Sequence, residues 1–286
     1  MRILCLHGAG TSAKIFESQT SSFRSNLDPK RFQFDFVSGP YPASPAPSID
    51  LFFDPPYYVF WREPDAPSVK AAIKWLYELL ERRGPYDAVM GFSQGCFLTS
   101  ALLLYHAHER PNEPLPFKGA MFICGGVSLP ILSDMGYQVS EEAMKISEQT
   151  VKQLHATASS ISDLVRAPRD PDAPKRGLWD DPNGRTHDSE AGFPSDRRNI
   201  FGLDFTAFPK DFSIKIPTVH IVGAKDPRYP AGVQLAHFCD EGVSGSNRKT
   251  YDHGSGHDIP RTTIVSASIA SLMRWLEEMV MDEKSA

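Results

Sequence analysis

A serine between two glycines offers the clearest chemistry in the sequence, in the pentapeptide Gly91-Phe-Ser-Gln-Gly95. An apolar run precedes it and a long apolar stretch follows. We therefore expect a sharp turn from a strand into a helix, where a Cβ on either flanking residue would crowd nearby backbone. This turn lifts the Ser93 hydroxyl clear of the sheet and directs the Gln94 N–H toward a carbonyl oxygen that gains negative charge. Ser93 is the candidate nucleophile and Gln94 a candidate oxyanion donor; a purely structural tight turn is the alternative.

A serine hydroxyl is a poor nucleophile unless a base takes its proton, so a histidine is needed. Of the nine histidines, His257 has the most suitable position, in a glycine-rich loop between the last predicted strand and the last predicted helix. His253 in the same loop is the alternative base, although it lies closer to the end of the strand. The H-x-x-x-H spacing of the two residues suits zinc on a helix, which Gly254 and Gly256 disfavour, so we expect no metal.

A carboxylate must hold the tautomer of this base and stabilise the imidazolium that forms. Asp226 follows the apolar run 218–223 after only two residues, which places it at the carboxyl edge of a parallel sheet, beside the serine turn. Its alternative reading is a turn-forming Asp-Pro dipeptide. Asp252 and Asp258 are weaker candidates because they are too near His257 in sequence to approach its ring from below.

A second oxyanion donor is expected in the loop after the first strand, which reads His7-Gly-Ala-Gly-Thr-Ser12. Its glycines permit close backbone approach to a ligand, and they also suit a simple turn of the chain. We choose the N–H of Ala9 as the donor, with that of Gly10 as the alternative. His7 itself is expected to be structural.

The elements that must position these residues follow from the hydrophobic pattern. Six short, nearly continuous apolar runs predict buried parallel strands at 2–7, 32–37, 87–92, 118–124, 217–223 and 248–252. Helical patterns fall between them at 68–83, 93–109 and 262–281. This alternation predicts the α/β class, with a mainly parallel central sheet and helices on both faces, in a single domain over residues 1–286.

Two segments interrupt the alternation. Residues 39–67 are rich in proline and aromatic residues and predict an ordered loop with an apolar surface, whose aromatics either line an acyl pocket or pack in the core. Residues 130–212 predict an insertion between two strands, with one amphipathic stretch at 140–156. We interpret this insertion as a lid over the carboxyl edge of the sheet; a surface loop without a role is the alternative.

Composition excludes several classes of protein. The 286 residues carry a formal charge of −5 and contain no Lys/Arg cluster, which argues against nucleic-acid binding. The longest apolar stretch is too short to span a bilayer, and we expect no membrane association. Four scattered cysteines without a C-x-x-C pair favour a reducing compartment, and a strand that starts almost at Met1 leaves no room for a signal peptide. We therefore expect a cytoplasmic protein.

Four motifs make the chain resemble the α/β-hydrolases, and in particular the fungal family of serine hydrolases that includes small esterases and polyketide-releasing thioesterases. They are the segments 2–8, 91–95, 223–227 and 256–260. A looser similarity to acyl-protein thioesterases rests on the GFSQG pentapeptide and the HG-x-G loop. The resemblance assigns nucleophile, acid and base to the same three residues, Ser93, Asp226 and His257. Residues 130–212 depart from it, because they are longer than in compact members.

The expected function is that of a serine hydrolase that cleaves an acyl ester or thioester through an acyl-enzyme, without a metal or organic cofactor. The resemblance favours a thioesterase that releases a polyketide or related acyl chain from a synthase carrier domain in secondary metabolism. A general carboxylesterase is the first alternative. The second belongs to another class, a non-catalytic ligand-binding protein on a hydrolase fold.

Overall fold

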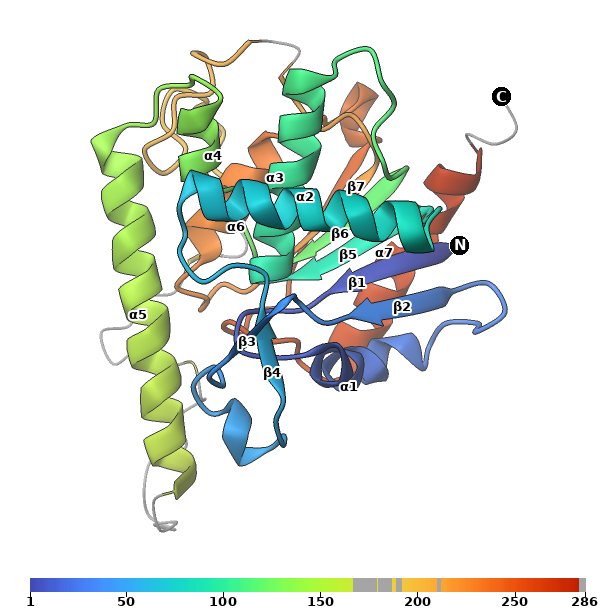
Figure 1. Ribbon diagram of the computed structural model, residues 1–286, viewed down its shortest axis with the longest axis vertical. Helices are drawn as coiled ribbons and strands as arrows, with labels where there is room; N and C mark the ends of the chain where they lie inside the picture. Colours follow the sequence, from blue (N-terminus) through green and yellow to red (C-terminus); the bar gives the residue numbers. More distant parts are fainter. Residues whose placement is uncertain (167–178, 180–186, 189–191, 210–211, 283–286) are drawn as a thin grey trace.

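A six-stranded sheet forms the centre of the computed structural model, which describes residues 1–166, 179, 187–188, 192–209 and 212–282 (Figure 1). The strand order is β2-β1-β5-β6-β7-β8, and every neighbouring pair is parallel. The strands are β1 (Arg2–Leu6), β2 (Gln33–Val37), β5 (Ala88–Phe92), β6 (Gly119–Ile123), β7 (Thr218–Val222) and β8 (Arg248–Asp252). All six predicted strands are confirmed, each within one residue of the expected bounds at either end.

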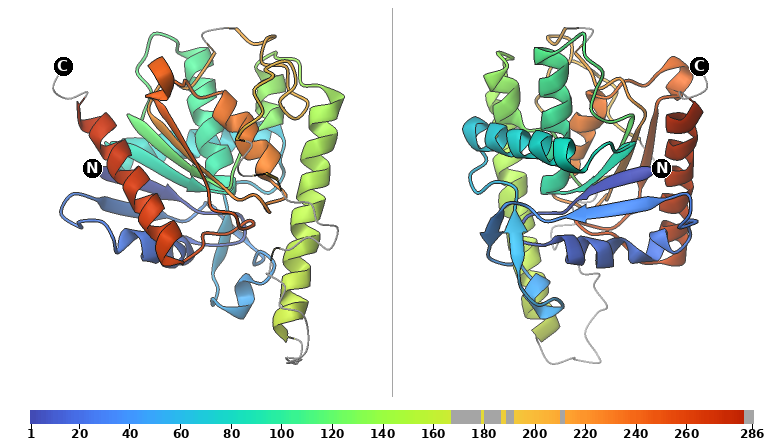
Figure 2. Two further views of the ribbon diagram at one scale, coloured as in Figure 1. Left: turned by 180° about the vertical axis from the view of Figure 1, so that it is seen from behind. Right: turned by 45° about the vertical axis from the view of Figure 1, so that its right-hand side comes forward.

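Helices cover both faces of the sheet, as predicted (Figure 2). On one face lie α1 (Ala13–Arg24) and α7 (Thr263–Asp282), and on the other lie α2 (Ala66–Arg83), α3 (Gln94–Glu109) and α6 (Tyr229–His237). Alternate residues of β1 divide between the two cores: Ile3 and Cys5 pack toward α1 and α7, whereas Leu4 and Leu6 pack toward α2 and α3. This division is the period-2 alternation of a strand that is buried on both sides.

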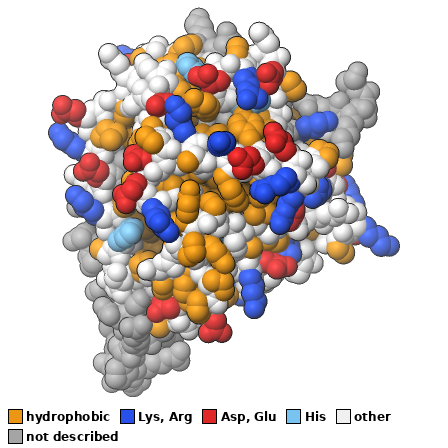
Figure 3. Space-filling view, in the orientation of Figure 1, with side chains coloured by type: hydrophobic (Ala, Val, Ile, Leu, Met, Phe, Trp, Pro, Cys, Tyr) orange, Lys and Arg blue, Asp and Glu red, His pale blue; other side chains and the backbone are white. Residues whose placement is uncertain are grey.

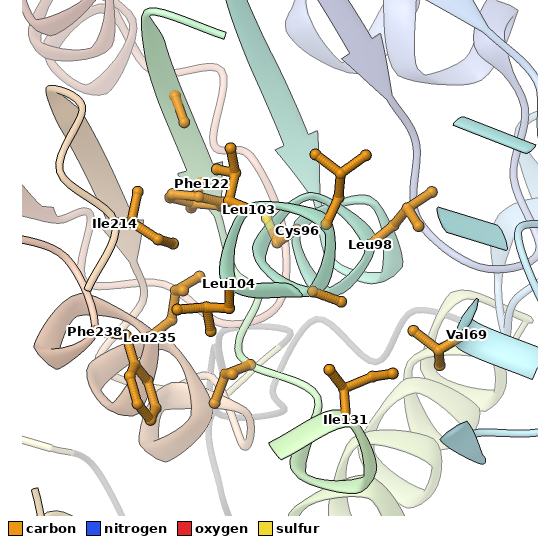
Figure 4. Packing of buried hydrophobic residues seen from close by; sticks show 14 of the residues in the cluster. Val69, Cys96, Leu98, Leu103, Leu104, Phe122, Ile131, Ile214, Leu235 and Phe238 are labelled. Atoms are coloured by element: carbon orange, nitrogen blue, oxygen red, sulfur yellow. The ribbon is translucent and has the colours of Figure 1, made fainter. Parts of the chain in front are cut away.

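Helix α3 is buried on nearly all sides, and its fixed position also fixes the nucleophile candidate Ser93, which immediately precedes it. Leu98, Leu102 and Leu103 have no exposed surface, and Figure 4 shows side chains of β6, α2, α4 (Leu129–Asp134) and α6 around the helix. A helix that is apolar around its whole circumference is typical of a protein interior.

The proline-rich segment 39–67 is ordered, as predicted, and contains a small antiparallel hairpin. Its strands are β3 (Tyr41–Ala43) and β4 (Tyr57–Val59), with the short 3-10 helix η1 (Ile49–Leu51) between them. Tyr58 also forms an antiparallel bridge with Thr11, in the loop that follows β1. The hairpin is therefore attached directly to the loop in which the second oxyanion donor is predicted.

The insertion between β6 and β7 contains α4 and then α5 (Glu141–Arg166), which extends beyond the predicted amphipathic stretch 140–156. In Figure 1, α5 stands across the edge of the sheet at which the strands end. Residues 167–178, 180–186, 189–191 and 210–211 lie outside the described residues, so the prediction for that part of the insertion does too. Among the described residues, no helix is both long and apolar enough to cross a membrane.

Candidate active site

Three side chains from distant segments form a chain of hydrogen bonds at the carboxyl edge of the sheet. Ser93 follows β5, Asp226 follows β7 and His257 follows β8. The Oγ of Ser93 lies 2.9 Å from Nε2 of His257, and Nδ1 of His257 lies 2.9 Å from Oδ2 of Asp226. A carboxylate only accepts hydrogen bonds, so Nδ1 carries the proton and Nε2 is left to accept from the serine hydroxyl. The structure thus brings together the three residues that the sequence singles out.

The turn at Ser93 is strained in the way that the pentapeptide predicts. Ser93 has a φ of 49° and a ψ of −114°, a backbone conformation that residues other than glycine rarely adopt. It immediately precedes the first residue of α3. A Cβ on Gly95 would lie 2.1 Å from the carbonyl oxygen of Leu6, and one on Gly91 would lie 2.7 Å from the amide nitrogen of Cys96. The two glycines are therefore required by the close approach of backbone on both sides of the serine.

The carboxylate of Asp226 is almost completely buried, with 2% of the residue exposed. Its Oδ1 accepts a hydrogen bond of 2.7 Å from the backbone N–H of Arg228, which leaves Oδ2 for His257. Both carboxylate oxygens are thus used, and the orientation of the carboxylate is fixed.

The alternative residues of the same loops have other partners. His253 accepts from the N–H of Ser255 at 3.1 Å, its Nε2 lies 3.5 Å from the sulfur of Cys124, and burial lowers its pKa. Asp252 accepts from the backbone N–H of Ala224 at 2.9 Å. Burial raises the pKa of Asp258, which favours its neutral form. It is His257, and not His253, that lies within hydrogen-bond distance of Ser93.

The two candidate oxyanion donors in the loop after β1 differ in whether their backbone N–H already has an acceptor. The N–H of Gly10 donates to the carbonyl oxygen of Tyr58 at 3.0 Å and is already engaged. The N–H groups of Ala9 and Gln94, in contrast, donate to no acceptor among the described residues. Of the two donors considered in this loop, only Ala9 therefore has an N–H available to an oxyanion.

Hydrogen bonds to the carbonyl oxygen of Gly8 fix the direction of the Ala9 N–H. Nδ1 of His7 and Oγ1 of Thr11 each donate to this oxygen at 2.7 Å. Since the peptide unit is planar and trans, its N–H points away from its C=O. Anchoring the Gly8 carbonyl on one side therefore aims the Ala9 N–H to the other.

The tautomer of His7 follows from its second partner. Its Nε2 accepts from the backbone N–H of Gly39 at 2.9 Å, so Nδ1 must carry the proton that it donates. Burial lowers the pKa of His7 to about 4, which keeps the ring neutral at pH 7. The ring of His7 makes structural contacts, as expected, and these contacts support the loop of the candidate donor Ala9.

The side chain of Gln94 joins the serine turn to the end of the hairpin. Its Oε1 accepts from the N–H of Phe60 at 2.9 Å, and its Nε2 donates to the carbonyl oxygen of Trp61 at 3.0 Å. Phe60 is fully buried and packs on the ring of His7, whereas Phe52, in the same segment, is 66% exposed. The aromatic residues of the segment 39–67 thus divide between core packing and surface.

Comparison with known proteins places this chain in a family. Residues 1–269 match the family described as Serine hydrolase (FSH1). The chain belongs to the FSH1 serine hydrolase family. It is 28% identical over 282 residues to Esterase FPY3 of Fusarium mangiferae, covering 98% of this chain and 97% of that protein. It is 29% identical over 271 residues to Esterase alnB of Emericella nidulans, covering 91% of each.

Among solved structures, the crystal structure of Arabidopsis thaliana SOBER1 is similar with a TM-score of 0.49 and 18% identity, covering 98% of this chain and 99% of that one. The family match confirms the predicted resemblance to fungal serine hydrolases. This FSH1 protein is thus a serine hydrolase, with esterases among its relatives.

A cleft opens beside the two free N–H groups of the FSH1 hydrolase. Its volume is about 640 Å³, within the range of small-molecule sites. Its lining residues come from the loop after β1, from the hairpin and the residues that follow it, and from the first turn of α3: Ala9, Pro42, Ala43, Ser44, Val59, Trp61, Arg62 and Gln94. The cleft therefore contains both residues predicted to hold an oxyanion.

Helix α5 of the FSH1 hydrolase is fastened to both sides of the site. Near its amino end, Nη1 of Arg228 donates to the carbonyl oxygen of Ser147 at 2.9 Å and to the hydroxyl of Thr150 at 2.7 Å. Further along, the Ser48 hydroxyl donates to the carbonyl oxygen of Ala158 at 2.9 Å. Arg228 belongs to the loop of Asp226 and Ser48 to the hairpin, so α5 joins these two loops.

Sequence reasoning missed several residues of the site. Thr11 is one of them, and its hydroxyl donates to the carbonyl oxygen of Gly8. Arg228 is another, and it binds Thr150 of α5, which the sequence pattern does not place beside it. Trp179, in the insertion, lies on the loop of His257, because a Cβ on Gly256 would meet its indole at 2.1 Å. In the sequence, the glycine at position 256 is the only sign that another part of the chain comes this close.

One group of possible metal ligands occurs among the described residues. Ligand atoms of Cys124, Asp226 and His257 lie within 4.8 Å of one another. The Asp226 and His257 atoms already share a hydrogen bond, and burial raises the pKa of the Cys124 thiol well above its usual value. Cysteine binds a metal as the thiolate, and the raised pKa keeps Cys124 in the thiol form. The chemistry of these donors therefore does not favour a metal here.

Proposed function

We propose that this protein is an esterase or thioesterase in which Ser93 is the nucleophile, His257 the base and Asp226 the residue that orients the base. The observation that carries the proposal is the unbroken hydrogen-bond chain from Ser93 through His257 to Asp226. A non-catalytic binding protein would not need an imidazole held between a carboxylate and a serine in a strained conformation.

The reaction begins when Nε2 of His257 takes the proton of the Ser93 hydroxyl and Oγ forms a bond to the carbonyl carbon of the substrate. The N–H groups of Ala9 and Gln94 stabilise the negative charge on the carbonyl oxygen. The intermediate then expels the alcohol or thiol, which receives the proton from His257, and the acyl group remains on Ser93.

A water molecule completes the cycle. His257 takes one proton of the water, whose oxygen attacks the acyl-enzyme, and the returning proton restores the Ser93 hydroxyl. The products are a carboxylic acid and an alcohol or thiol. Each step uses only side chains and backbone N–H groups of this chain.

A carbon-rich acyl thioester is the substrate class that we favour, as in the release of a polyketide from a carrier domain in secondary metabolism. Two observations support it: the resemblance to polyketide-releasing thioesterases, and the hydrophobic side chains that gather over the β3–β4 hairpin (Figure 3). Tyr41 and Phe52 are exposed in this region. Exposed apolar surface of this kind is typical of binding sites for apolar ligands or protein partners. A general carboxylesterase is the second candidate, favoured by the esterases among the relatives.

We further propose that α5 is the lid of the site. It stands across the carboxyl edge of the sheet, and among the described residues three side-chain hydrogen bonds connect it to the loops on either side. Three hydrogen bonds are few enough to break and re-form when α5 moves to admit a substrate.

A fluorophosphonate probe, which reacts with activated serines, tests the catalytic proposal. We expect rapid labelling of the wild type, complete loss in Ser93→Ala and normal labelling in Ser21→Ala, which removes an exposed hydroxyl on α1. An unreactive wild type would instead favour the binding protein. Hydrolysis of matched hexanoyl esters and thioesters then distinguishes the two substrate classes, and Ser93→Ala should lower turnover by about 10⁶-fold.

A further inference from the structure

The cleft beside the oxyanion donors has an uneven distribution of polar groups. Five of its eight lining residues have apolar side chains, and the side-chain amide of Gln94 is occupied by the backbone of Phe60 and Trp61. The groups left to meet polar atoms of a ligand are the N–H groups of Ala9 and Gln94, the hydroxyl of Ser44 and the guanidinium of Arg62. Arg62 is the one ionised side chain among the eight lining residues.

Arg62 forms no ion pair with an acidic residue in the part of the chain that the structure describes. Within the described parts of the chain, no carboxylate oxygen lies within 4.0 Å of its guanidinium nitrogens. Instead, its guanidinium carbon lies 5.4 Å from the ring centroid of Tyr41, on the neighbouring strand of the hairpin. An aromatic ring holds a guanidinium in place through its face while the N–H groups at the edge remain free to donate.

A guanidinium with free N–H groups fits oxygen anions, which it binds through two parallel hydrogen bonds. A ligand that fills the cleft would place its carbonyl oxygen at Ala9 and Gln94, an uncharged body along Val59 and Trp61, and an anion at Arg62. Such a ligand has a negative group at some distance from the carbon that reacts.

We propose that Arg62 binds a phosphate or carboxylate group of the substrate and makes the enzyme selective for anionic esters and thioesters. This inference rests on the proposed function, whose site it extends. The anion has two possible sources: a phosphate on the departing thiol, as in a 4′-phosphopantetheine thioester, or a carboxylate at the far end of the acyl chain.

Binding of unreactive thioethers tests this proposal independently of catalysis. S-hexyl pantetheine is the neutral reference; S-hexyl 4′-phosphopantetheine carries the anion on the thiol side, and S-(5-carboxypentyl) pantetheine carries it on the acyl side. Calorimetry on the Ser93→Ala protein gives each Kd. We expect one anionic ligand to bind about 10-fold more tightly than the reference, and this preference to disappear with Arg62→Gln and return in part with Arg62→Lys.

A matched variant, Arg82→Gln, removes an exposed positive charge on α2 and should keep the preference. The anionic ligand that shows the preference identifies the source of the anion. Equal binding of all three ligands, or a preference that survives Arg62→Gln, would overturn the inference. A failure of the proposed function would appear elsewhere, as an absence of serine labelling and hydrolysis in the wild type.

Discussion

The guanidinium of Arg228 lies 2.7 Å from the hydroxyl oxygen of Thr150, and this hydrogen bond joins the loop of Asp226 to helix α5. The side chain is buried against the ring of Phe97, 5.2 Å from its centroid. Burial lowers the pKa of Arg228 to about 10, so the group is still charged at pH 7. The position of the proposed lid and that of the carboxylate are therefore set by neighbouring parts of one short loop.

Removing this guanidinium should loosen α5. We expect Arg228→Met to destabilise the packed position of the helix by about 2 kcal/mol, because the hydrogen bonds to Ser147 and Thr150 are lost. Hydrogen exchange over residues 141–160 should accelerate accordingly. The comparison variant Ser48→Ala removes the single bond to Ala158 and should have about half this effect. Unchanged exchange in Arg228→Met would show that α5 is held by other contacts.

The two histidines of the last loop should behave oppositely. His257→Ala removes the proposed base and should lower kcat by about 10⁵- to 10⁶-fold, with loss of fluorophosphonate labelling. His253→Ala removes a ring that faces Cys124 and not Ser93, so labelling should persist, within about 10-fold of the wild-type rate. Rates of labelling measured on both folded variants decide the assignment, and the reverse pattern would make His253 the base.

The hydroxyl of Thr11 is expected to matter for the rate more than for substrate binding. Thr11→Val removes one of the two hydrogen bonds that hold the Gly8 carbonyl, so the Ala9 N–H loses part of its fixed direction. We expect kcat to fall about 10-fold with little change in KM, since the oxyanion contact is strongest in the transition state. Thr20→Val, which removes another buried hydroxyl that bonds a backbone carbonyl, is the control and should leave kcat unaltered. A change confined to KM would contradict this role.

The buried ring of His7 should make stability depend on pH. Its pKa is about 4 in the folded protein against 6.5 for a free side chain, so between these values the unfolded chain binds the proton and the folded protein does not. The stability associated with the neutral ring of His7 is fully present above pH 6.5 and is lost as the pH falls toward 4. At pH 4.5 the loss from this residue is about 2–3 kcal/mol.

Urea unfolding at pH 7.5 and 4.5 measures this effect. In His7→Gln, which keeps an acceptor for Gly39 but cannot be protonated in this range, the free energy of unfolding should change less between the two pH values, by about 2–3 kcal/mol. The other histidines remain in both proteins and cancel in the comparison. An identical pH dependence in the two proteins would mean that His7 is not the group responsible.

The parallel sheet was readable in the sequence because its strands are continuous apolar runs, and the serine turn because two glycines are required beside Leu6 and Cys96. Helix α1 was missed, since its serines and threonines obscure the pattern of its buried residues. Helix α6 was missed because it is short. Contacts such as that of Arg228 with Thr150 join residues far apart in the sequence and depend on the folded path of α5, which no local pattern specifies.

The bridge between Thr11 and Tyr58 joins the loop of the proposed oxyanion donor Ala9 to the hairpin that lines the cleft. In many enzymes a recognition loop can be exchanged while the chemical machinery stays intact. Here a graft of the β3–β4 hairpin from a relative would also replace the backbone that forms hydrogen bonds with Gly10 and Thr11, next to the Ala9 amide. A new substrate range acquired in this way should come with an altered turnover, even for the original substrate.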